Sequence, residues 1–244
     1  MIRLRLAHTR GRFRNDWLDA RFSFSFGDYR DPAFDGYSDL MVFNDDRVAP
    51  GGGFAEHGHR DVEVMSYPVA GAVEHRDSLG NVALMRPGDV HLMRAGRGIR
   101  HSEMNASRVD PEHHLQWWIR PAQRGLEPAY ARIHVGADDK RNRLRAIATP
   151  EGGPGVLALA QDARVFAALV DDAELIYRPP AGRWTHLHVV AGALRIGTPA
   201  GPDAGPELVA GDAAFIEDEA AVRLDSRGSA QPADLLLFDL RGST

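Results

Sequence analysis

The chain has 244 residues, with 29 Lys and Arg against 34 Asp and Glu, which gives a formal net charge of −5 at pH 7. Its lack of cysteine excludes disulfides, thiolate zinc sites, iron–sulfur clusters and cysteine nucleophiles, so any metal must be held by nitrogen and oxygen ligands. The acidic balance argues against a nucleic-acid surface, which needs clustered positive charge. With no signal-peptide pattern and no apolar run of membrane-spanning length, we expect a cytoplasmic protein.

Short segments between dense glycine and proline turns predict many short strands. In chain order, the predicted strands are 22–26, 40–43, 62–69, 72–75, 82–85, 90–93 and 115–119. The predicted turns are 44–46, 77–81 and 87–89. Only residues 163–170 have a modest helical periodicity, and this segment also fits a strand. The sequence therefore predicts an all-β fold, as a sandwich or barrel.

The two halves of the chain resemble each other. The stretch around Gly71 is similar to that around Gly192, about half a chain length away, and a Gly-Asp turn follows each at a similar spacing. Two strand–turn–strand landmarks at nearly one offset indicate a duplicated β-domain. We therefore expect one domain over residues 1–135 and a second over residues 136–244.

Two short patterns concentrate metal-ligating side chains: H-x-H at His57 and His59, and H-x-E at His101 and Glu103. In an extended chain, residues two apart point to the same face, with about 6.6 Å of rise between them. Two such pairs on neighbouring strands can converge on one ion. Three imidazoles and one carboxylate leave two positions of an octahedron open, which suits iron, manganese, nickel or copper better than a closed structural zinc site.

Several stretches of the N-terminal half resemble the pirin family. They are His57–Glu63, Val69–Gly71, Pro87–Asp89 and Ala95–Glu103, with Trp17–Asp19, Phe24–Phe26, Asp31–Pro32 and Asn44–Asp46 upstream and Gln116–Ile119 downstream. The resemblance is close over residues 1–125 and looser beyond, and the Gly-Ile-Arg-His-Ser-Glu run is its most specific part. One departure is Gly58, since the family often has proline between the first two ligand histidines; the glycine loosens the backbone and leaves both ligands in place.

This resemblance implies a bicupin, in which two jelly-roll β-barrels are joined and the N-terminal barrel holds one metal. It implies His57, His59, His101 and Glu103 as ligands of Fe(II), with Ni, Cu, Mn or Zn as alternatives. Bacterial members with quercetin 2,3-dioxygenase activity open a flavonol ring with O₂, and we expect this activity on a flavonol-like substrate. The alternative is a non-enzymatic, iron-binding regulatory protein whose redox state controls its binding to a protein partner.

A third and weaker hypothesis is a cupin isomerase or hydrolase that uses the metal as a Lewis acid. None of the hypotheses includes direct contact with nucleic acid or a membrane, and the family pattern implies a monomer. In the dioxygenase hypothesis, Glu103 is both a ligand and the base that takes the proton of the flavonol 3-hydroxyl. Candidates for an apolar substrate pocket, each of which also fits a place in the core, are Phe54, Met65, Met93 and Trp117.

Other candidate ligands have to be weighed against this set. Glu63 has the spacing from His59 at which many cupins carry a ligating glutamate, whereas the pirin resemblance assigns that role to Glu103. A second H-x-H at His186 and His188 falls on the strand after the position equivalent to the ligand loop, so we expect a metal-free C-terminal barrel. The remaining histidines are interpreted as surface or structural residues: His8, His75, His91, His113, His114 and His134.

Overall fold

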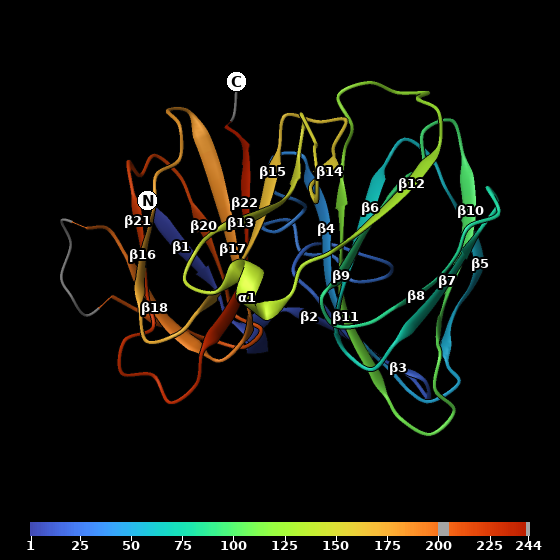
Figure 1. Ribbon diagram of the computed structural model, residues 1–244, viewed down its shortest axis with the longest axis horizontal. Coiled ribbons are helices and arrows are strands. Elements are labelled where there is room, and N and C mark those ends of the chain that lie inside the picture. Colours follow the sequence, from blue (N-terminus) through green and yellow to red (C-terminus); the bar gives the residue numbers. More distant parts are fainter. Residues whose placement is uncertain (200–204, 243–244) are drawn as a thin grey trace. The chain divides into compact units, whose positions relative to one another are not determined.

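A computed structural model of the protein describes residues 1–199 and 205–242, and nearly all of its regular structure is β-strand (Figure 1). Within this part of the chain the helical elements are the 3₁₀ turn η1 (Ala7–Thr9) and the one-turn helix α1 (Ala137–Lys140). No described helix is long and apolar enough to cross a membrane. The predicted all-β fold is confirmed.

The chain divides into two compact units. The N-terminal unit consists of Arg10–Val135 and Pro150–Gln161, and the C-terminal unit consists of Met1–Thr9, Gly136–Thr149 and Asp162–Thr244. Met1–Thr9 therefore belongs to the C-terminal unit and Pro150–Gln161 to the N-terminal unit, whereas a single boundary after residue 135 would assign each to the other unit. The two-domain division at that residue stays a prediction.

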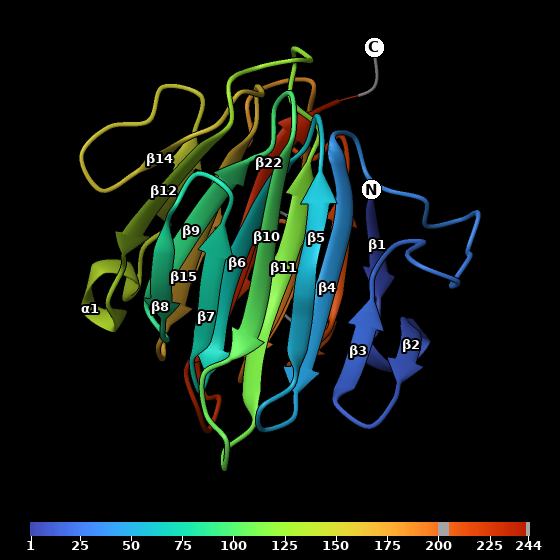
Figure 2. The ribbon, with the colours of Figure 1, turned by 90° about the vertical axis from the view of Figure 1, so that its right-hand side faces the viewer.

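The N-terminal unit contains two antiparallel sheets. The strands of the larger sheet are β2 (Gly11–Arg14), β3 (Leu18–Phe22), β4 (Leu40–Val48), β6 (Glu63–Ala70), β9 (Asp89–Arg94), β11 (Glu112–Ile119) and β12 (Ala129–His134), in the order β12-β9-β6-β11-β4-β3-β2. The smaller sheet contains β5 (Gly53–His59), β7 (Val73–Asp77), β8 (Val82–Met85) and β10 (Ile99–Asn105), in the order β5-β10-β7-β8, and Figure 2 looks onto it. The short strand β14 (Leu157–Ala158) also lies in this unit.

Alternation along β10 places the candidate ligands inside this unit. Ile99, His101, Glu103 and Asn105 are buried, while the residues between them are more exposed. Since successive side chains of a strand point to opposite faces, this face of β10 looks toward the larger sheet. The hydroxyl of Ser66 on β6 donates a hydrogen bond to Glu103 across the interior, so the two sheets enclose the site between them.

The C-terminal unit has the same kind of construction. Its strands are β1 (Ile2–Arg5), β13 (Arg145–Thr149), β15 (Arg164–Val170), β16 (Glu174–Tyr177), β17 (Arg183–Ala191), β18 (Ala193–Gly197), β19 (Glu207–Val209), β20 (Ala213–Ile216), β21 (Val222–Asp225) and β22 (Ala233–Arg241). One sheet has the order β1-β20-β17-β22-β15-β13, and the other has the order β16-β21-β18-β19. Leucine and valine side chains of β17 and β22 form much of its core.

The repeat around Gly71 and Gly192 has a structural counterpart. Gly71 lies between β6 and β7 with a φ of +72°, and Gly192 lies between β17 and β18 with a φ of +74°. A Cβ at either position would lie within 3.0 Å of backbone, so both turns require glycine. The two units therefore contain the same glycine turn at equivalent positions.

Two predicted elements are wrong, and one ambiguity is settled. The predicted strand 22–26 fails because β3 ends at Phe22 and a loop follows it. The predicted turn at 44–46 is the middle of β4, because this segment pairs with β3 on one side and β11 on the other. Pairing on both sides outweighs the turn preference of Asn and Asp. Residues 164–170 form β15, not a helix.

Candidate metal centre

The predicted ligands come from two neighbouring strands of the smaller sheet. β5 and β10 are antiparallel, with His101 opposite His57 and Ile99 opposite His59. The register shifts between His101 and Glu103, which is the mark of a β-bulge or similar irregularity. The pairing brings the three histidines together from positions far apart in the sequence.

The three imidazoles point their Nε2 atoms at one place. His101 Nε2 lies 3.0 Å from His59 Nε2 and 3.1 Å from His57 Nε2. Two nitrogens at right angles on a metal, each bonded at about 2.1 Å, are separated by about 3.0 Å. The spacing of the histidines therefore fits adjacent positions around a single ion.

Contacts on the far side of the rings orient these nitrogens. His57 Nδ1 lies 2.8 Å from the Ala55 carbonyl oxygen and donates its proton to it. His101 Nδ1 lies 3.4 Å from His75 Nδ1, and His75 Nε2 lies 3.2 Å from an oxygen of Asp77. Partners of this kind fix the ring tautomer and leave Nε2 with a free electron pair for a metal.

Burial keeps two of these imidazoles uncharged. It lowers the pKa of His59 to about 4, and the neighbouring rings of His101 and His57 add to the effect. The pKa of His101 is lowered to about 4 as well, mainly by burial and against the opposing influence of Glu103. Both rings are therefore neutral at pH 7, which is the form that binds a metal.

Glu103 lies beside His101 and is held by the larger sheet. Its carboxylate accepts a hydrogen bond of 2.7 Å from the Gln116 side-chain amide and one of 3.1 Å from the Ser66 hydroxyl. Candidate ligand atoms of His75, His101 and Glu103 lie within 4.8 Å of one another, and those of His57, His59 and His101 form a second such group. His101 belongs to both groups.

The carboxylate of Glu103 is ionised at neutral pH. Burial acts to raise the pKa of Glu103, but the electrostatic influence of His101, His91 and His114 outweighs it. The pKa therefore lies well below the ordinary value of a glutamate. An ionised carboxylate can bind a cation or accept a proton.

Glu63, the alternative ligand, is occupied elsewhere. Both of its oxygens lie 2.9 Å from the backbone N–H of Ala160, and neither metal-type group of the described residues includes it. Burial raises the pKa of Glu63 to about 7, although the Ala160 hydrogen bond and Arg94 oppose this. Glu63 thus fastens the segment 150–161 to β6.

A cavity of about 920 Å³ opens beside the histidines, and His57, His59 and Glu103 line it. Most of its wall is apolar and aromatic, formed by Trp17, Leu18, Phe22, Phe26, Tyr29, Phe54 and Trp118. Of the four pocket candidates from the sequence, Phe54 lines this cavity. The other three are fully buried core residues: Met65, Met93 and Trp117.

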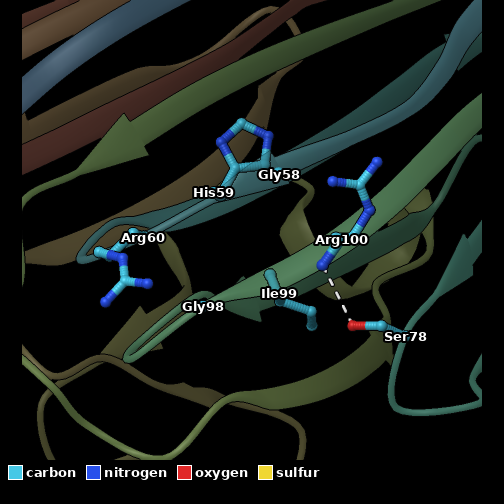
Figure 3. A pocket seen from close by; sticks show the side chains of 7 residues that line it. All are labelled: Gly58, His59, Arg60, Ser78, Gly98, Ile99 and Arg100. Carbon is cyan, nitrogen blue, oxygen red and sulfur yellow. Dashed lines mark hydrogen bonds between the residues drawn. The ribbon is translucent and has the colours of Figure 1, made fainter.

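A shallower hollow of about 360 Å³ lies at the other side of His59, where β5 ends and β10 begins (Figure 3). Arg60 and Arg100 stand on either side of it, and the Arg100 N–H donates a hydrogen bond of 3.1 Å to the Ser78 hydroxyl. Gly58 and Gly98 also line it. Because it is polar and open, it suits solvent better than an aromatic ligand.

Three histidines that the sequence left without a role surround the site. His75, His91 and His114 are all buried in the interior of the N-terminal unit. His75 lies directly opposite Glu103 in the pairing of β7 with β10, a relation that only the pairing register reveals. No sequence spacing connects His91 to the site, although its Nε2 lies 3.7 Å from Glu103.

The second H-x-H pair lies within the C-terminal unit. His186 and His188 are buried on β17, and the ring of His186 packs against Phe215 and Phe238. No group of metal-ligating side chains within residues 1–199 and 205–242 includes either of them.

Comparison with known proteins places this geometry in a family. The Pirin family model matches residues 3–119, and the model of the quercetinase C-terminal cupin domain matches residues 146–240. A curated relative from Escherichia coli, named quercetin 2,3-dioxygenase, is 36% identical over 98% of this chain and 99% of its own length. A Mycobacterium tuberculosis relative, named putative quercetin 2,3-dioxygenase, is 34% identical over 98% and 95%.

Solved structures agree with this match. The crystal structure of the bacterial pirin YhhW from Escherichia coli in complex with nickel(II) is 34% identical, covers both chains completely and superposes with a TM-score of 0.90. The agreement extends over both units, so the two cupin-type domains expected from the sequence are confirmed. The chain belongs to the pirin family of bicupin proteins.

Proposed function

We propose that this protein is a metal-dependent dioxygenase that opens the ring of a flavonol-like substrate with O₂. The observation that carries the proposal is the convergence of three imidazole nitrogens at one side of a large, mainly apolar cavity. The names of the Escherichia coli and Mycobacterium tuberculosis relatives support it. A monomer in the cytoplasm is part of the same proposal.

The residues fit a divalent transition metal. His57, His59 and His101 would hold it with Glu103, and a nitrogen-rich donor set of this kind suits Fe(II), which we propose as the metal, or Ni, Cu, Mn or Zn. The nickel complex of the bacterial pirin YhhW supports a divalent ion at such a site. A bound metal would act as a Lewis acid toward an anionic substrate oxygen and would supply the redox chemistry for the reaction with O₂.

The protein's own contribution is to bind, orient and deprotonate the substrate. Trp118 and Phe54 flank the histidines and offer flat apolar surfaces to an aromatic ring. Glu103 accepts the proton of the substrate hydroxyl, and Gln116 and Ser66 hold the carboxylate in place for that transfer. The apolar wall excludes water from the reacting oxygen.

Quercetin turnover tests the proposal directly. Protein loaded separately with iron, nickel, copper or manganese is mixed with quercetin in air, and the loss of its visible absorption is followed together with oxygen uptake. We expect turnover with at least one metal. We expect none in the His101→Ala variant, which loses the imidazole that belongs to both groups of candidate ligands. An absence of turnover with every metal would overturn the proposal, and a rate that survives His101→Ala would belong to free metal.

A further inference from the structure

Two polar side chains of the cavity wall have no role in the proposed chemistry. Asn44 and Asp46 line the cavity and are only 4% and 3% exposed. Within the described part of the chain, Asn44 Oδ1 and Asp46 Oδ1 have no hydrogen-bond partner. Since a buried polar atom without a partner costs free energy, a pair of them beside a cavity indicates that something else satisfies them.

Their place on β4 connects them to the site. Asn44 lies opposite Gln116 on β11, and Asp46 lies opposite His114. Gln116 donates a hydrogen bond to Glu103, and Asn44 is the neighbour of Gln116 across the strand pair. Asp46 lies two residues further along β4, a distance of about 6.6 Å. The row of polar groups therefore extends away from Glu103 along a wall whose surface is mostly apolar.

Two buried ionisable side chains lie behind the carboxyl group of Asp46. Asp46 Oδ2 lies 3.7 Å from His114 Nε2, and the other ring nitrogen of His114 is hydrogen-bonded to Glu112. Burial raises the pKa of Asp46 to about 7; His114 opposes this shift, and Asp45, Glu112 and Glu103 reinforce it. Near neutral pH a large share of the carboxyl groups keep their proton, so that Asp46 can donate as well as accept.

We propose that Asp46, together with Asn44, determines specificity for polyhydroxylated substrates by hydrogen-bonding a ring hydroxyl remote from the one that Glu103 deprotonates. The inference rests on the proposed function for the identity of the substrate. Aromatic walls discriminate weakly between rings that differ by a hydroxyl. A site built to pair with that hydroxyl rejects the analogue that lacks it, because its own buried polar groups are then left unpaired.

Binding to the metal-free protein provides the test, since it does not depend on catalysis. Trp17 and Trp118 line the cavity, so quenching of tryptophan fluorescence reports occupancy. The probes are quercetin and 3-hydroxyflavone, which share the 3-hydroxyl and differ in the hydroxyls of the other positions. We expect the wild type to bind quercetin about 10-fold more tightly or better. Asp46→Leu should remove most of this preference, because the wall then lacks the group that pairs with the additional hydroxyl.

Two variants separate recognition from folding. Asp46→Asn keeps a neutral group that donates and accepts, and it should retain most of the preference. Asp35→Leu removes an exposed carboxylate outside the cavity and should leave the ratio unchanged. Near-ultraviolet circular dichroism confirms that each variant is folded.

The inference is overturned if the wild type binds both compounds equally, or if Asp46→Leu weakens both equally, since a structural role moves both affinities together. A preference that depends on Asp46, without turnover on any metal, supports the inference while the dioxygenase proposal fails. Turnover of quercetin by a protein that shows no binding preference supports the dioxygenase proposal and overturns the inference about Asp46.

Discussion

At the scale of single residues, His101 is the centre of the candidate site because both of its ring nitrogens are used. Nε2 faces His57 and His59, and Nδ1 faces His75, which in turn contacts Asp77. A ring held from both sides loses little freedom when a metal binds, since its orientation is already set. The site is therefore preorganised by the second row of side chains behind it.

Glu63 gives a prediction about pH. Its folded pKa of about 7 lies above the ordinary value of 4.5, so ionisation costs the folded state more than the unfolded chain. Stability is therefore lost as the pH rises from 4.5 through 7. The glutamine side chain of the Glu63→Gln variant stays neutral at every pH. We therefore expect the free energy of unfolding of this variant, relative to that of the wild type, to increase by about 1–3 kcal/mol from pH 5 to pH 8. Urea unfolding at both pH values measures the difference.

The same variant separates the two candidate carboxylate ligands. Since Glu63 contacts the Ala160 backbone, Glu63→Gln should keep the metal content of the wild type, whereas Glu103→Gln should lower it. A loss of bound metal in Glu63→Gln would contradict the assignment of this carboxylate to a structural contact.

At the scale of elements, the site depends on how closely β5 approaches β10. Gly53 begins β5 with a φ of +151°, and a Cβ there would lie 2.5 Å from the carbonyl oxygen of Glu103 and 2.6 Å from Met104 Cα. Both neighbours are backbone atoms, so neither can turn away. The absence of a side chain at this position lets the two strands pair where the ligands lie.

Gly53→Ala should therefore disturb stability and metal binding together. Gly51→Ala is the matched control, because Gly51 also has a positive φ, +67°, but nothing lies within 4 Å of its Cβ position. We expect the control to cost about 1–2 kcal/mol for the backbone alone. Gly53→Ala should cost more and should weaken nickel binding, as measured by urea unfolding and nickel titration. Equal stability and equal nickel affinity of the two variants would refute the close approach.

The strand period explains which parts of the site could be predicted from the sequence. His57 with His59, and His101 with Glu103, share a face of their strands by spacing alone. The cavity wall was harder to predict from the sequence, because Trp117 and Trp118 are adjacent on β11 and face opposite sides. Only the pairing register shows that Trp118 faces the cavity while Trp117 lies in the core.

The same limit applies to the polar interior. Asp46 belongs to a segment whose composition is typical of a turn, and only pairing with both β3 and β11 makes it part of a strand. His91 reaches Glu103 across the gap between the sheets, a contact that no local pattern encodes. Contacts between sheets depend on the complete fold, and a single sequence does not specify them.

At the scale of the whole molecule, two units of similar construction differ in what their interiors hold. In the N-terminal unit, β10 carries His101 and Glu103 and pairs with β5, which carries His57 and His59. In the C-terminal unit, the two strands that correspond to them in sheet order are β16 and β21, and neither carries a histidine. The C-terminal unit therefore has the same kind of scaffold without the histidine ligands.

This difference predicts a stoichiometry of one metal per chain. Equilibrium dialysis against nickel, followed by elemental analysis, should give one ion for the wild type and also for His188→Gln, whose histidine lies in the core of the C-terminal unit. His101→Ala should retain almost none, because removing one of three imidazoles leaves the others too few partners to hold the ion. Thermal unfolding shows whether the variants are folded. Two ions per wild-type chain, or a single ion that survives His101→Ala and disappears with His188→Gln, would place the metal in the other unit.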